Sequence, residues 1–160
     1  MPHLVILYTP NLEGSTNLDA LCRSLADAML AVRDEDGQQV FPTGGTRVLA
    51  FPAAHYAVAD GKNDYGFMYL NLRMGAGRSD AVKKQSGDTV LATVQRHFAP
   101  IFEKSLIGIT VQVDESPGQV YDAKHSTLHP LFHPAVIPAQ TGIQGIKPEG
   151  GSSGFPPPRE

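Results

Sequence analysis

The stretch HLVILY, residues 3–8, decides how the rest of the chain is interpreted. It is short and almost entirely apolar, which is typical of a β-strand buried on both faces in a sheet covered by helices. The turn-forming residues PNLEGS follow at 10–15, so the strand ends near Tyr8. We therefore expect a sheet that begins with this strand and carries a layer of helices.

A helical pattern begins directly after that turn. Thr16 and Asp19 have the three-residue spacing of a capping box. The charged turn at 34–37 ends the helix, and Gly37 suits the position just beyond its last residue. Apolar residues at helical spacing form one stripe, which includes the single cysteine as a packing residue: Leu18, Leu21, Cys22, Leu25, Ala28, Met29 and Val32.

The second half of the chain has the same order of elements. Strands are predicted at 46–51, 67–74 and 106–113, and Ser79 is a plausible N-cap for a long second helix. The chain is therefore β-α-β followed by β-α-β. Two such units in tandem give an α/β (α+β) fold with one four-stranded sheet and both helices on one face.

The other face of that sheet would have no cover in a single chain. The strand face of Met68, Leu70 and Leu72, or the face of opposite parity, would then be an exposed apolar patch. Oligomerisation would cover it.

Composition excludes several classes of function. Apolar residues make up 41% and charged residues 18%, as in an ordinary globular domain, and the net charge of -3 gives no support for a nucleic-acid partner. No apolar run approaches the ~18 residues of a membrane span, and no secretory signal is recognisable. A lone cysteine forms neither a disulfide framework nor a thiolate metal site. We expect a cytoplasmic protein without a membrane partner.

The composition changes after Phe132. Residues 133–160 contain six prolines and five glycines, which is typical of irregular chain. We predict a folded domain at 2–132 and a Pro/Gly-rich C-terminal tail at 133–160. The apolar residues in the tail leave open an arm that lies over a neighbouring subunit.

Three stretches together resemble one family: PHLVILYT at 2–9, FPTGGTRV at 41–48 and ADGKNDYGFMYLNLRMGAGRS at 59–79. They are similar to the 5-carboxymethyl-2-hydroxymuconate isomerases of the tautomerase superfamily, and the resemblance extends over 2–132. It implies a homotrimer, cofactor-independent catalysis by an N-terminal proline, and a dicarboxylate or tricarboxylate dienol substrate from aromatic catabolism. The tail and a longer loop at 34–37 depart from the family pattern.

Pro2 is the candidate general base. A methionine before proline is normally removed, which would leave Pro2 with a secondary amine. An α-amino group has a pKa of about 7.7–8.0, and nearby cations and partial burial lower it toward neutrality. Such a base can take a proton and return it, as moving a double bond requires. The alternative is a proline that only starts an edge strand.

Two arginines are candidates for binding the substrate. Arg78 lies at the predicted start of the second helix, where a guanidinium can grip a carboxylate; the alternative is an ion pair with Asp80 or exposure to solvent. The resemblance places functional arginines at Arg78 and Arg47. The resemblance implies that Arg47 binds the 2-oxo acid end of the substrate, where a cation stabilises the developing dienolate. The alternative for Arg47 is a surface residue on an edge strand.

His3 matches the family's start and is a further candidate for substrate binding. Successive strand residues point to opposite faces, so His3 does not share the direction of Pro2 and is equally well explained as structural. Phe41 and Tyr65 are candidates for the wall of the site or for the core.

No metal or cofactor is expected. His125, His129 and His133 have a four-residue spacing, but Pro130 and Pro134 prevent one helix from presenting all three. The glycines at 44–45 and 75–77 are too few for a nucleotide-binding motif.

The leading hypothesis is a cofactor-independent isomerase of the tautomerase type. One alternative is a hydratase, dehalogenase or decarboxylase of the same fold, which would need a carboxylate to activate water; Glu13 and Asp64 are the nearest candidates. Another is a non-enzymatic trimeric binding protein.

Overall fold

The computed structural model describes residues 2–118, 121 and 123–132, so the predicted tail lies outside the described residues. Within these residues no helix is both long and apolar enough to cross a membrane. The elements follow in chain order: β1 (His3–Tyr8), η1 (Pro10–Leu12), α1 (Leu18–Leu30), η2 (Thr43–Gly45), β2 (Arg47–Pro52), β3 (Tyr65–Gly75), α2 (Asp80–Phe102), β4 (Leu106–Ser116) and α3 (His129–Phe132).

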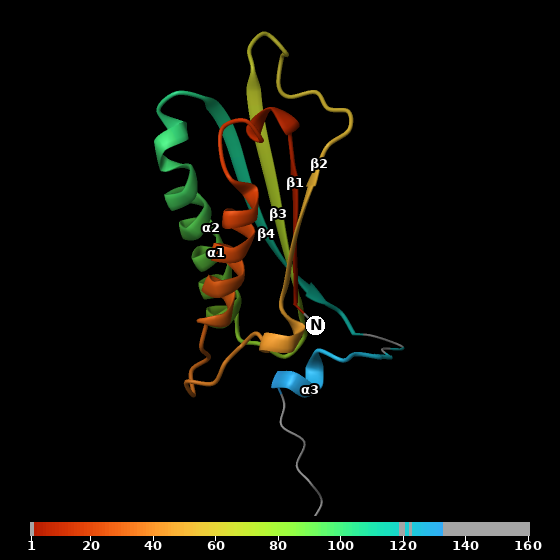
Figure 1. Cartoon of the computed structure of the whole chain (residues 1–160). Helices are drawn as coiled ribbons and strands as arrows, with labels where there is room; N and C mark the ends of the chain where they lie inside the picture. The colour runs from red at the N-terminus through yellow and green to blue at the C-terminus, as the bar shows by residue number, and fades with distance from the viewer. Residues whose placement is uncertain (1, 119–120, 122, 133–160) are drawn as a thin grey trace, which may run out of the picture.

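The four strands form one sheet in the order β2-β1-β3-β4 (Figure 1). β1 and β2 are parallel, as are β3 and β4, whereas the central pair β1 and β3 is antiparallel. Parallel neighbours need a long crossover, and α1 and α2 provide the two crossovers. The prediction of two tandem β-α-β units is confirmed.

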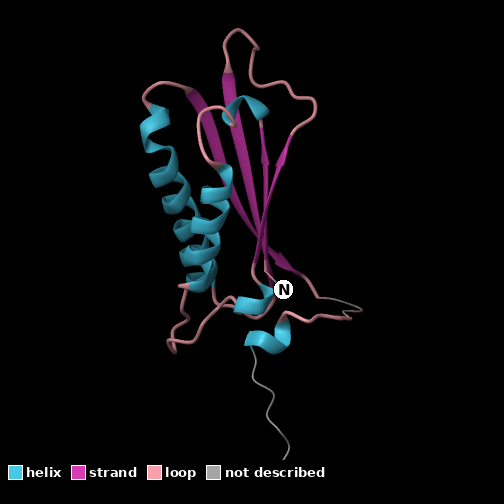
Figure 2. Cartoon of the chain, viewed as in Figure 1, coloured by secondary structure: helices cyan, strands magenta, loops and turns pink. Residues whose placement is uncertain are grey.

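Both helices pack on the same face of the sheet (Figure 2). The strand residues that point toward them are fully buried, among them Leu4, Ile6 and Leu70. Burial of apolar surface contributes about 25 cal/mol per Å², so this single core is the main source of stability. Helix residues complete it: Leu21, Leu25, Met29, Val82, Val90, Val94 and Phe98.

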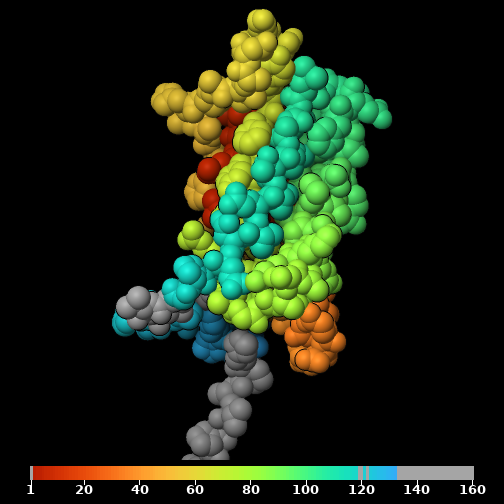
Figure 3. Space-filling model, turned by 180° about the vertical axis from the view of Figure 1, so that it is seen from behind, coloured from red at the N-terminus to blue at the C-terminus, as the bar shows by residue number. Residues whose placement is uncertain are grey.

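The opposite face of the sheet has no helix over it, and from behind, β1, β3 and β4 lie at the surface (Figure 3). Met68, Leu70 and Leu72 point toward the helices, so the uncovered face is the one of opposite parity. Leu7 on that face is 49% exposed. The prediction that the first strand is buried on both faces is therefore wrong for a single chain.

Two of the predicted helix caps are also wrong. Asn17, not Thr16, is the N-cap of α1, and its Oδ1 accepts a hydrogen bond from the Ala20 amide at 2.9 Å. Thr16 Oγ1 lies instead 2.6 Å from His97 Nε2 on α2. Gly37, at φ 75°, forms the turn that lets residues 33 and 39 bridge rather than the end of α1.

The other two local predictions are confirmed. Ser79 is the N-cap of α2, since its Oγ accepts from the Val82 amide at 3.2 Å. Cys22 is partly buried against the core, as a packing residue would be.

Phe98 and Phe102 offer a matched test of this core. Their rings meet edge to face with centroids 6.3 Å apart, but Phe98 is fully buried whereas Phe102 is 40% exposed. Phe98→Ala is expected to lower the free energy of unfolding by about 3–5 kcal/mol, because it leaves a cavity. Phe102→Ala, the control, should cost less than half as much. Urea unfolding at one fixed protein concentration measures both, and equal losses would contradict the assigned core.

Candidate active site

The predicted site residues gather at one end of the sheet, where β1 and β2 begin and β3 ends (Figure 1). Pro2 is buried immediately before β1. His3 pairs with Arg47 on one side and Arg73 on the other. Continuing the register by one residue places Pro2 beside Met74 of β3, whose side chain points toward the helices.

Arg78 is fixed on the helix side of this end. Its Nη1 donates to the Gly75 carbonyl at 2.8 Å and its Nη2 to the Val40 carbonyl at 3.1 Å. Its Cζ lies 5.9 Å from the centroid of the Phe41 ring, which is fully buried. These two bonds use two of the five guanidinium N–H donors. No hydrogen bond joins the others to a described residue, so the group is held in place yet able to bind an anion.

Asp80, the alternative partner predicted for Arg78, forms an ion pair with another residue. Asp80 Oδ1 lies 3.4 Å from Lys83 Nζ in an ion pair one turn along α2. Arg78 therefore faces a cavity rather than a carboxylate of its own helix. The cavity has a volume of about 400 Å³. It is lined by residues of the loop after α1, of the turn before α2 and of the first turn of α2: Asp34, Glu35, Gln39, Val40, Ala76, Gly77, Arg78, Ser79 and Val82.

The rim of this cavity carries a negative charge. The Ser79 hydroxyl donates to the Glu35 carboxylate, and this hydrogen bond holds the pKa of Glu35 below its usual range. Asp34 is held in the same loop, since its Oδ1 accepts from the Asp36 and Gln38 amides at 3.0 and 2.7 Å. A ligand carboxylate at Arg78 would thus have acidic neighbours on its outer side.

Arg47 and His3 lie on the uncovered face, not beside Arg78. They are register partners, and His3 has the parity that points away from the helices. Arg47 Nη1 donates to the Gly45 carbonyl at 2.9 Å. Burial, followed by the charges of Arg47 and Arg73, lowers the pKa of His3. The Pro2 end of the sheet therefore carries cations on both faces.

Arg73 was missed by the sequence reasoning. Alternation within β3 places it on the uncovered face, but its position beside His3 follows only from the pairing of β1 with β3. Tyr65, a candidate for the wall, lies at the other end of β3 in the same chain, where its hydroxyl donates to Asp60 Oδ1 at 2.9 Å.

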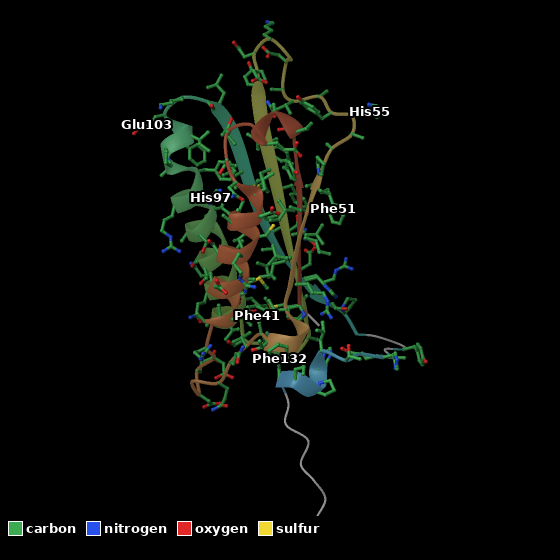
Figure 4. All side chains as sticks on the ribbon, viewed as in Figure 1. Phe41, Phe51, His55, His97, Glu103 and Phe132 are labelled. Carbon is green, nitrogen blue, oxygen red and sulfur yellow. The ribbon has the colours of Figure 1, made fainter. Side chains whose placement is uncertain are left out.

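The short helix α3 lies at this end of the molecule. α3 packs on η2 so tightly that a Cβ at Gly44 would lie 3.2 Å from Phe132 Cδ2 and 3.4 Å from the His129 Cα. Figure 4 shows Phe41 and Phe132 at the same end of the chain. His129 Nδ1 lies 2.9 Å from Ser126 Oγ. Across the described residues, no three His, Cys, Asp or Glu side chains are grouped to hold a metal ion.

Comparisons with known proteins find relatives of this chain over the same residues. The model of the 5-carboxymethyl-2-hydroxymuconate isomerase family matches residues 2–132. A crystal structure of 5-carboxymethyl-2-hydroxymuconate delta-isomerase is 53% identical with a TM-score of 0.80, covering 84% of this chain and 95% of that one. A 5-carboxymethyl-2-hydroxymuconate isomerase from Deinococcus radiodurans R1 is 32% identical with a TM-score of 0.71, covering 82% and 94%. The 5-carboxymethyl-2-hydroxymuconate Delta-isomerase of Escherichia coli is 26% identical over 132 residues, 82% of this chain and 99% of its own.

The cations around His3 lead to a measurable pKa. An NMR titration should place the pKa of His3 below its ordinary value of 6.5, and Arg47→Gln should raise it because a neighbouring positive charge is lost. Because the pKa is lower in the folded than in the unfolded chain, the stability that His3 contributes is present above pH 6.5. It is lost as the pH falls through the folded value.

Arg23→Gln is the control for this titration, since Arg23 is exposed on α1 and pairs with Asp27. It should leave the pKa of His3 unchanged. A pKa that does not respond to Arg47→Gln would contradict the placement of Arg47 beside His3.

Proposed function

The chain belongs to the 5-carboxymethyl-2-hydroxymuconate isomerase family and is an isomerase, and on that premise we propose that Pro2, exposed as a free amine by removal of Met1, is its general base. The substrate is a 2-hydroxymuconate-type dienol with two or three carboxylates, and the reaction uses no cofactor. One observation carries this proposal: buried Pro2 lies at the end of the sheet where Arg78 stands on one face and Arg47 on the other.

Each residue has a separate task in the isomerisation. Arg78 holds a carboxylate of the substrate in the cavity beside α2. The Pro2 amine removes the proton of the 2-hydroxyl group, and Arg47 stabilises the negative charge that develops on that oxygen. The protonated amine then returns the proton to C3 or C5 of the dienolate. One C=C bond becomes a C=O bond, and the product has the composition of the substrate.

The surroundings of Pro2 favour its role as a base at neutral pH. Burial and the neighbouring cations both disfavour the ammonium form of an amine. The depressed pKa of His3, the next residue, reports the same two effects. A free Pro2 amine is therefore expected to have a pKa below the ~7.7–8.0 of an ordinary α-amino group.

The two carboxylates that the sequence suggested for the hydratase, dehalogenase or decarboxylase alternatives lie away from Pro2. Glu13 accepts a hydrogen bond from the Tyr8 hydroxyl at 2.8 Å, and Asp64 accepts one from Asn11 at 2.7 Å. Glu13 follows the end of β1, and Asp64 precedes the start of β3. The end of β1 and the start of β3 lie together at the end of the sheet opposite Pro2. Within one chain, neither carboxylate is placed to activate water beside Pro2.

The exposed apolar side chains of the uncovered face support a homotrimer. Four of them are 36–49% exposed in the single chain, and they lie on three neighbouring strands: Leu7, Leu49, Phe51 and Phe67. In Figure 4, Phe51 projects from β2 on the side away from the helices. A contiguous apolar patch of this kind marks an interaction surface. We propose that three copies bury it in a closed, cyclic assembly.

Substitution of Pro2, the proposed base, and of Arg78, which holds a substrate carboxylate, tests the mechanism. Pro2→Ala is expected to lower kcat by roughly 100-fold or more, since general base catalysis contributes about 10²–10⁴-fold. Arg78→Ala should raise KM and lower kcat, and Arg78→Lys should restore part of the loss. The assay follows the ultraviolet absorbance of 2-hydroxymuconate, with Arg23→Ala as the control. Intact mass spectrometry should show a chain without Met1. Full activity in both Pro2→Ala and Arg78→Ala, or in a chain that retains Met1, would refute the mechanism.

Sedimentation equilibrium tests the assembly. The protein should have three times the mass of one chain, and Phe51→Glu should dissociate it because a carboxylate would be buried in an apolar interface. Ala92→Glu adds the same charge to the exposed surface of α2 and should leave the mass unchanged. A monomeric wild-type protein, or equal behaviour of the two variants, would contradict the trimer.

A further inference from the structure

One row of charged side chains crosses the uncovered face at the Pro2 end of the sheet. Arg47 on β2 pairs with His3 on β1, His3 pairs with Arg73 on β3, and Arg73 pairs with Asp114 on β4. Register partners share a face, so all four side chains have the parity that points away from the helices. The row is contiguous from one edge of the sheet to the other.

The row carries an excess of positive charge. Arg47 and Arg73 flank His3. Burial and the charges of these two arginines lower the pKa of His3, which disfavours its charged form. Asp114 supplies the one negative charge. Its carboxylate accepts hydrogen bonds from Asn71 Nδ2 at 2.7 Å and from Gln112 Nε2 at 2.8 Å, so it is held at the outer strand.

The Arg73 guanidinium takes no part in these hydrogen bonds. It is exposed, and neither a hydrogen bond nor an ion pair within 4.0 Å joins it to a described residue. Asp114 is near enough to feel its charge but not to pair with it. Arg73 thus offers a bidentate hydrogen-bond donor to an anion. It lies on β3, beside His3 of β1, the residue that follows Pro2.

We propose that Arg73 is a substrate-binding residue that holds the C1 carboxylate of the 2-hydroxy acid, next to the 2-oxygen that Arg47 stabilises. This inference rests on the proposed function. In a 2-hydroxy acid the carboxylate and the hydroxyl oxygen are on adjacent carbons, and Arg73 and Arg47 stand on the two sides of His3 in one row. Arg78, on the helix side, then holds the distal carboxylate.

Because Arg73 and Arg78 bind different carboxylates, Arg73 is a determinant of substrate specificity. In this proposal a dicarboxylate crosses the end of the sheet, with one carboxylate at Arg73 on the uncovered face and the other in the cavity lined by Arg78. Pro2 lies between the two anchors, where the reacting atoms of such a substrate would be. A substrate without the C1 carboxylate would lose only what Arg73 contributes.

Kinetics with two half-esters isolates that contribution. The probes are 2-hydroxymuconate, its C1 monomethyl ester and its C6 monomethyl ester. Arg73→Gln should raise KM about 10- to 100-fold for 2-hydroxymuconate and for the C6 ester, the loss expected for a charged hydrogen-bonded pair, with kcat changed little. For the C1 ester, Arg73→Gln and wild type should agree within about twofold, because the interaction is already absent. Arg73→Lys should recover part of the loss.

The control is Arg96→Gln, which removes an exposed arginine from the outer face of α2 and should leave all three substrates unaffected. Equal losses in Arg73→Gln on all three substrates, or no loss on any, would overturn the proposal.

Binding of 2-oxoadipate, measured by calorimetry, separates this proposal from the catalytic one. Weaker binding to Arg73→Gln than to wild type supports the anchor, even if wild type turns over no dienol and the role of Pro2 fails. Equal affinities refute the role of Arg73, whatever the turnover.

Discussion

The antiparallel pairing of β1 with β3 is the constraint on which the rest of the molecule depends. It sets the beginning of β1 against the end of β3, and so brings residue 3 beside residue 73. The two β-α-β units meet along this pair, and their crossovers carry both helices to the same face. The turn that follows β3 then starts α2 at the same end, which places Arg78 at the Pro2 end of the sheet.

Alternation along the strands divides this end of the sheet into two environments. Toward the helices there are buried apolar side chains, and Arg78 is fixed there by two backbone carbonyls. Away from the helices there is the charged row with Arg47 and Arg73. Pro2 lies where the two environments meet, so an amine at that position is buried and at the same end of the sheet as the cations. Both effects would lower the pKa of a free Pro2 amine, which favours the role as a general base that we propose for it.

The same alternation places the charged row and the apolar side chains of the proposed interface on one face of the sheet. Beyond the charged row, the uncovered face is apolar, with Leu49 and Phe51 on β2 beside β1. Covering this face would remove apolar surface from water and lower the dielectric around the row. Interactions between the arginines and a bound carboxylate would then be stronger than at an open surface.

The sequence alone determined the order of the elements, the N-cap Ser79, the family and the candidates Pro2, Arg47 and Arg78, because hydrophobic periodicity, cap chemistry and short motifs are local. It misplaced the cap of α1, since Thr16 and Asn17 are adjacent and both suit an N-cap. The sequence also led to the wrong prediction that both faces of β1 are buried, because an apolar run does not show which face of the sheet the helices cover. Only the tertiary structure decided that Arg47 and Arg78 lie on opposite faces and that Arg73 joins Arg47 across His3. The reason is physical: these relations depend on the register of hydrogen bonds between strand residues 44 and 70 positions apart in the chain, which no local pattern encodes.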